Sequence, residues 1–178
     1  MRTARWLSLA IVAPILSACA APRTGAFRPG PEPVTLRYIN PGTLAALPGF
    51  THAVKVGQTV YVSGEVALDS LGHLVGPGDL RAQVRQAFAN LALVLKIAGA
   101  VPADVTKLTI YLVNAGPRDF ETVRQTQTEL FGDRNPPAGV VVGVQSLPMD
   151  GLLIAVDATA VVRAMFRPLE ERERSYRP

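Results

Sequence analysis

Cysteine and histidine are nearly absent from this 178-residue chain, and their scarcity excludes several kinds of chemistry. Cys19 is the only cysteine, so the chain has no disulfide framework and no cysteine nucleophile within its globular part. The two histidines, His52 and His73, are too few and too isolated for a histidine-based metal site. We therefore expect neither a metal nor thiol chemistry.

Clustered positive charge is also lacking. Eighteen Lys and Arg against 14 Asp and Glu give a net charge of +4, which falls to +2 (16 − 14) without Arg2 and Arg5. The remaining basic residues are dispersed, whereas a surface that tracks phosphates needs them on one face. The few aromatic residues do not alternate with basic ones, so base stacking is not indicated. Nucleic acid is therefore not an expected partner.

The N-terminal segment predicts export. Two arginines precede an apolar run from Trp6 to Leu16, which is the order of a secretory signal and is too short to span a bilayer as a stable helix. The run ends in LSAC, which resembles the lipobox of bacterial lipoproteins, where the cysteine is lipidated and becomes the first mature residue. We expect residues 1–18 to be a lipoprotein signal peptide, and acyl chains on Cys19 to anchor the protein to a membrane.

Two alternatives stay open for this segment: an ordinary signal peptide with an incidental cysteine, and a cytosolic protein with an apolar N-terminal helix. In a lipoprotein, Ala20 favours the periplasmic side of the outer membrane, because an aspartate there would resemble an inner-membrane retention signal. Residues 19–33 contain four prolines and predict an extended tether. Residues 163–178 carry charges of both signs and predict a solvated tail.

Residues 34–162 carry the periodicity of a folded domain. Asp79 as N-cap and Gly99 beyond the last turn delimit a predicted helix. Its apolar stripe follows three- and four-residue steps and consists of Val84, Ala87, Phe88, Leu91, Val94, Leu95 and Ala98. A second helix is predicted from Pro117 to Gly132, with a sparser apolar face of Phe120, Val123, Leu130 and Phe131. Strands are predicted at 34–39, 52–56, 59–63, 104–114, 139–144 and 151–162, with a Gly57-Gln58 hairpin turn.

This order of elements predicts an α+β fold, a mixed β-sheet with its two helices packed on one face. The last two strands are almost continuously apolar, which suits strands that are covered on both faces. We therefore expect oligomerisation to bury the open face of the sheet.

Six segments in this order resemble the Rid family of reactive intermediate deaminases: HAVKVGQTVYVSGEVALD, QVRQAFANLALVLKIAGA, VTKLTIYLVN, DFETV, NPPAGVVVGVQSLP and LLIAVDATAVV. The resemblance runs from about Phe50 to Val162. It implies a chorismate-mutase-like fold and a homotrimer with three small-molecule clefts at its subunit interfaces. It also implies hydrolysis of imines and enamines such as 2-aminoacrylate, to a keto acid and ammonia, with no cofactor or metal.

The resemblance further implies which residues line the cleft. In the family archetype an arginine holds the substrate carboxylate and a glutamate places the water, but here Gly139 and Ala155 occupy these positions. The candidate cleft residues are Phe50, His52, Ser63, Gly64, Glu65, Arg124, Gly139 and Asp157. A hydrogen-bonding role within a strand stays open for His52, a structural role for Asp157, and a solvated helix position for Arg124.

Two functions follow from these substitutions. Loss of a buried charge-assisted partner costs about 2–5 kcal/mol, and loss of a positioned acid or base costs about 10²–10⁴ in rate, so we do not expect the archetypal mechanism. The chain is then either a divergent imine or enamine hydrolase or a non-catalytic module that binds a small ligand or a partner. A ribonuclease is not indicated, because neither a histidine pair nor a basic cleft is present.

Replacement of the single cysteine tests the predicted anchor. Cys19→Ser should abolish labelling by a palmitate analogue and release the protein from membranes, because serine offers no thiol to acylate. Ser8→Ala, a control within the apolar run, should label like the wild type. Wild-type protein found soluble in the cytosol would contradict the lipoprotein prediction.

Overall fold

The computed structural model of the chain describes residues 34–132 and 135–163, so the predicted signal peptide and tether, and nearly all of the tail, lie outside the described residues. Within this part, no helix is long and apolar enough to cross a bilayer. Six strands form one sheet in the order β1-β2-β3-β6-β4-β5. The elements are β1 (Leu36–Ile39), β2 (Ala53–Val56), β3 (Thr59–Val66), α1 (Leu80–Ala98), the 3₁₀ turn η1 (Pro102–Asp104), β4 (Val105–Val113), α2 (Pro117–Phe131), β5 (Ala138–Val144) and β6 (Ile154–Val161).

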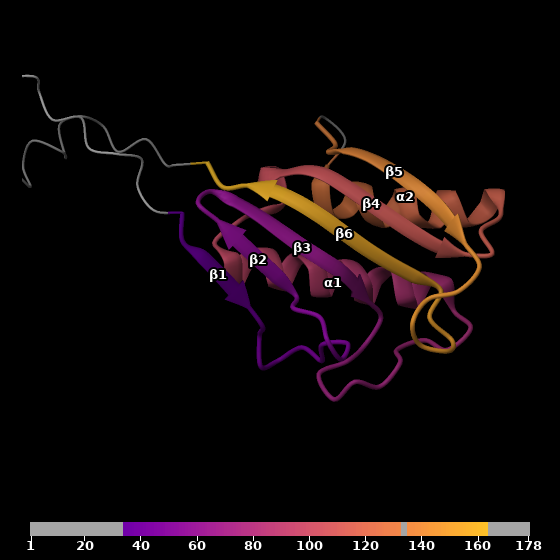
Figure 1. The fold of residues 1–178 in the computed structure, drawn as a ribbon. Coiled ribbons are helices and arrows are strands. Elements are labelled where there is room, and N and C mark those ends of the chain that lie inside the picture. The colour runs from indigo at the N-terminus through magenta and orange to yellow at the C-terminus, as the bar shows by residue number, and fades with distance from the viewer. Residues whose placement is uncertain (1–33, 133–134, 164–178) are drawn as a thin grey trace, which may run out of the picture. The chain divides into compact units, whose positions relative to one another are not determined.

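Both helices lie on the same face of the sheet, behind the strands in Figure 1. Neighbouring strands are antiparallel except β4 and β5, which run parallel on either side of the α2 crossover. The predicted α+β architecture is therefore confirmed: a mixed sheet with two helices on one face.

The hairpin between β2 and β3 fixes the register of the strands that carry the candidate cleft. Val56 lies opposite Thr59, so Gly57 and Gln58 form the predicted two-residue turn. Gly57 has a φ of +58°, which glycine adopts at little steric cost. The same register brings Ala53 opposite Val62, next to the predicted cleft residues at the start of β2 and within β3.

The predicted stripe of α1 is buried in full. The Asp79 side chain accepts a hydrogen bond from the Ala82 N–H at 3.1 Å, and Gly99 ends the helix with a φ of +79°. All seven stripe residues are at most 2% exposed, and they form the main core with the apolar residues of β3, β4 and β6. Each fully buried large apolar side chain contributes about 1.5–3 kcal/mol, so this contact holds the helix on the sheet.

Two apolar segments, β5 and the start of α2, are more exposed in the single chain than their sequences suggest. The apolar sequence of β5 predicts cover on both faces, yet β5 is the edge strand beside β4, and Val140 is 52% exposed. An apolar run reports composition and does not distinguish an edge strand from a central one. On α2, Phe120 in the first turn is 43% exposed, and burial is concentrated further along at Val123 and Thr126.

The sheet face opposite the helices carries exposed apolar side chains. The register places Tyr38, Val54 and Tyr61 side by side on neighbouring strands, so they share one face. Tyr38 is 64% exposed and Tyr61 is 53% exposed. Leu36, Val140 and Val161 add to the exposed apolar residues of the strands. Exposed apolar residues gathered in this way mark an interaction surface.

We expect this face to be covered by further copies of the chain. Light scattering should give the mass of a homotrimer for the wild type, and Tyr61→Glu should dissociate it, because the apolar contact would bury an unpaired charge. Phe120→Glu, at an exposed aromatic residue on α2, serves as the control and should remain trimeric. A monomeric wild type would contradict the expectation.

Candidate functional site

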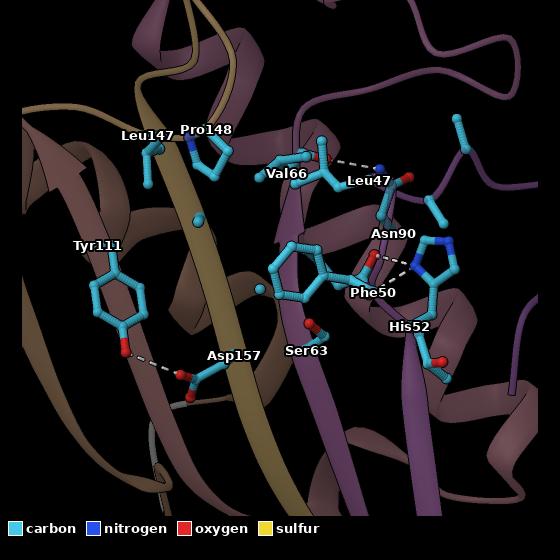
Figure 2. Close-up of a pocket in the computed structure, with 16 residues that line it drawn as sticks. Leu47, Phe50, His52, Ser63, Val66, Asn90, Tyr111, Leu147, Pro148 and Asp157 are labelled. Atoms are coloured by element: carbon cyan, nitrogen blue, oxygen red, sulfur yellow. Dashed lines mark hydrogen bonds and ion pairs between the residues drawn. The ribbon is translucent and has the colours of Figure 1, made fainter. Parts of the chain in front are cut away.

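A cavity of about 330 Å³ lies where β3, β4 and β6 meet the loop that precedes β2 (Figure 2). The cavity is also lined by Asn90 from α1 and by Leu147 and Pro148 from the loop before β6. The cavity brings together six of the eight predicted cleft residues: Phe50, His52, Ser63, Gly64, Glu65 and Asp157.

An irregularity in β3 shapes the floor of this cavity. Pairing of β3 with β6 shifts between Val62 and Glu65, so Ser63 and Gly64 fall out of the regular ladder. Such bulges redirect side chains and are common beside functional sites. A Cβ added to Gly64 would lie 3.7 Å from the Cβ of Ala155, so two small residues face each other here. Ala155, at the archetypal glutamate position, thus contributes only a methyl group to the wall.

His52 and Glu65 form a buried pair in the cavity wall. The Nδ1 atom of His52 lies 2.9 Å and 3.1 Å from the two carboxylate oxygens of Glu65, and the residues are 8% and 3% exposed. Burial raises the pKa of Glu65, although the hydrogen bond and the charge of His52 act in the opposite direction. The carboxyl therefore holds its proton more tightly than a carboxyl in water does. A pair of this kind can share a proton and deliver it to a ligand.

The second ring nitrogen of His52 is unsatisfied. Its Nε2 atom is buried and has no hydrogen-bond partner among the described residues. An unpaired buried polar group costs about 1–3 kcal/mol, and a bound ligand, a water or a neighbouring chain would offset this cost. The atom therefore marks a place where the site is incomplete.

A second polar pair joins β4 to β6. The Tyr111 hydroxyl donates to the Oδ2 atom of Asp157 at 3.1 Å, and the Asp157 charge raises the pKa of Tyr111. The hydroxyl thus keeps its proton and stays a donor. In Figure 2 this pair and His52 lie at opposite ends of the view, with the Phe50 ring between them.

Asn90 and Tyr111 also line the cavity, although neither is among the predicted cleft residues. The Asn90 amide is buried and donates to the carbonyl oxygens of Val66 at 2.9 Å and Leu68 at 3.0 Å, so it holds the chain that leaves β3. Asn90 is a polar residue within the apolar part of α1, and this position could have indicated a buried, hydrogen-bonded role. Nothing local distinguishes Tyr111 from an ordinary strand residue, because its role depends on the pairing of β4 with β6.

Arg124 and Gly139, the remaining two candidates, do not line the cavity. Arg124 projects from α2 and makes two hydrogen bonds of 2.9 Å to Glu121, so it does not return a guanidinium to the cleft of its own chain. No lysine or arginine lines the cavity within the described part of the chain. His73 pairs with Asp69 in an exposed loop, at 3.3 Å.

Gly139 is held by the close pairing of β5 with β4. It lies opposite Leu108, and a Cβ added to it would come within 2.8 Å of the Leu108 carbonyl oxygen. Real Cβ atoms essentially never approach a backbone oxygen so closely, so any side chain here requires the strands to move. Glycine at position 139 thus suits the close packing of the two strands, and it also leaves the position without the archetypal arginine.

Residues 42–162 match the family described as Endoribonuclease L-PSP, which is more than half of the chain. The chain belongs to this family, the Rid family. A 2-iminobutanoate/2-iminopropanoate deaminase of Rattus norvegicus is 38% identical to the Rid chain over 118 residues, which cover 66% of this chain and 82% of that protein. A RutC family protein of Pyrococcus abyssi is 34% identical over 111 residues, 62% of this chain and 84% of that protein.

Solved structures agree on the fold of the Rid chain. RidA from Psychrobacter sp. PAMC 21119 is 27% identical with a TM-score of 0.64, and the match covers 71% of this chain and 99% of that one. YyfB of Yersinia pestis, a Rid family protein of unknown function, is 40% identical with a TM-score of 0.57, over 71% of this chain and 98% of that one. The family resemblance and the chorismate-mutase-like fold are thereby confirmed.

The two glycines of β5 test the packing requirement. Gly139→Ala should lower the free energy of unfolding by about 1–3 kcal/mol, because the new methyl group displaces the Leu108 carbonyl. Gly143→Ala is the matched control, since an added Cβ there has no neighbour within 4 Å, and it should be nearly neutral. Equal denaturation midpoints for the two variants would contradict the close approach at Gly139.

Proposed function

We propose that this Rid chain hydrolyses a small imine or enamine in the cavity, without a cofactor or metal. The observation that carries the proposal is the buried His52–Glu65 pair in the cavity wall. Family membership supports the reaction class, because the similar rat protein is named a 2-iminobutanoate/2-iminopropanoate deaminase.

The pair suits the proton transfers of this reaction. An imine becomes reactive when its nitrogen is protonated, water then adds to the carbon, and a second proton on nitrogen lets the C–N bond break and ammonia leave. Glu65, whose pKa is raised by burial, supplies the proton to nitrogen. His52 shares that proton through Nδ1 and helps the pair to accept the proton that the attacking water loses. The Ser63 hydroxyl, also in the wall, is available to orient the water.

A non-catalytic binding protein is the second candidate. It is favoured by Gly139 and Ala155, which stand where the Rid archetype has its carboxylate-binding arginine and its water-positioning glutamate. In that case the cavity holds a small ligand without turnover.

We also propose, from the sequence and the family, that the chain is exported, anchored through Cys19 and trimeric. The exposed apolar residues on the open sheet face support self-association. Within a trimer, a neighbouring chain would complete the cavity wall.

Ammonia release tests the reaction. Imines generated in situ by an amine oxidase should lose ammonia faster with the wild-type protein than in buffer. Glu65→Gln should slow this release by about 10²–10⁴, because glutamine still accepts a hydrogen bond from His52 but cannot transfer a proton. Glu129→Gln, the same change at an exposed residue of α2, is the control and should keep the wild-type rate.

Two outcomes would count against the proposal. Undiminished turnover by Glu65→Gln would remove Glu65 from the reaction. Tight ligand binding by the wild type, with no acceleration for any imine, would favour the non-catalytic alternative.

A further inference from the structure

Three ionisable side chains besides Tyr111 line the cavity: Asp157 and the paired His52 and Glu65. Glu65 and Asp157 contribute carboxyl groups, and no lysine or arginine of the described part of the chain faces them. Charges interact more strongly in a partly buried site than in water, because the effective dielectric constant is lower. Because Glu65 is already paired with His52, Asp157 is the carboxylate that would repel a ligand carboxylate and attract a cationic nitrogen.

Asp157 has the geometry of a counter-charge. Its Oδ2 atom accepts the Tyr111 hydroxyl, and its Oδ1 atom has no hydrogen-bond partner among the described residues. Its charge also raises the pKa of Tyr111, so the hydroxyl stays protonated and donates to Oδ2. One carboxylate oxygen is thus held in place while the other can receive an N–H donor.

Aromatic rings add to the preference for a cation. Phe50 and Tyr111 both line the cavity, and both rings stand in the part of the site drawn in Figure 2. A cation near the face of an aromatic ring gains about 0.5–2 kcal/mol from the ring quadrupole. A planar iminium group, with its charge on C=N, matches both a ring and a carboxylate.

A neighbouring copy cannot restore the missing guanidinium from the archetypal position. Every copy carries Gly139, so this position supplies no side chain in any copy, and a Cβ built there lies 2.8 Å from the Leu108 carbonyl oxygen. The feature that would hold a substrate carboxylate is therefore excluded at this position throughout an assembly of identical chains.

From these features we infer that the cavity selects small imines or enamines that lack a carboxylate, binds their cationic iminium form against Asp157, and rejects keto-acid-type substrates. The substrate class, imines and enamines, rests on the proposed function. The charge preference itself is a property of binding and can be measured without turnover.

Three probes that join the same isopropyl group to a planar head group test the charge preference: isobutyrate is an anion, isobutyramide is neutral and isobutyramidinium is a cation. Calorimetric titration of the full chain in its native assembly should give tighter binding of isobutyramidinium than of isobutyrate, by at least about tenfold. The neutral amide should fall between them. Asp157→Asn keeps an acceptor for the Tyr111 hydroxyl but removes the negative charge. In this variant the ratio of the isobutyramidinium affinity to the isobutyrate affinity should fall about tenfold, which is the free energy that corresponds to one pKa unit.

Glu129→Gln removes one negative charge from the exposed surface of α2 and should leave the ratio unchanged. Equal or tighter binding of isobutyrate by the wild type would overturn the inference, and so would failure of all three probes to bind at millimolar concentration. An unchanged ratio in Asp157→Asn would overturn the role of Asp157. If the protein binds the amidinium preferentially but hydrolyses no imine, the proposed function is wrong and the charge preference is still supported.

Discussion

The candidate site depends on one buried contact, the 2.9 Å interaction between His52 Nδ1 and Glu65. It joins the residue before β2 to the irregular end of β3, and both partners stay buried because the core of α1 and the sheet holds these strands. A carboxyl placed there must be paired or protonated, since a buried unpaired charge is costly. The same burial that threatens stability therefore gives Glu65 a raised pKa and a proton to transfer.

Local patterns were sufficient to predict the scaffold. The Asp79 cap, the apolar stripe of α1 and the Gly57-Gln58 turn each follow from a few adjacent residues, and each appears as predicted. Edge and centre are properties of the whole sheet, so the exposure of β5 could not be inferred from its own apolar sequence. The exposure of Phe120 could not be inferred for a related reason, because a sparse apolar stripe does not specify where the packing of a helix begins.

The site was predictable only in part. Six of the residues that the family resemblance implies line one cavity, because the resemblance carries information about three-dimensional neighbours that periodicity lacks. It did not predict the Tyr111–Asp157 contact, which arises from the register of β4 on β6, nor the strand approach that makes glycine necessary at position 139. No lysine or arginine among the described residues lines the cavity in place of the archetypal arginine.

A crystal structure of the assembled protein with isobutyramidinium bound is the most direct test of the account. We expect the ligand inside the cavity, with one nitrogen within hydrogen-bond distance of Asp157 Oδ1 and the planar group beside Phe50 or Tyr111. A ligand bound elsewhere, or held in the cavity away from Asp157, would contradict the proposed binding mode.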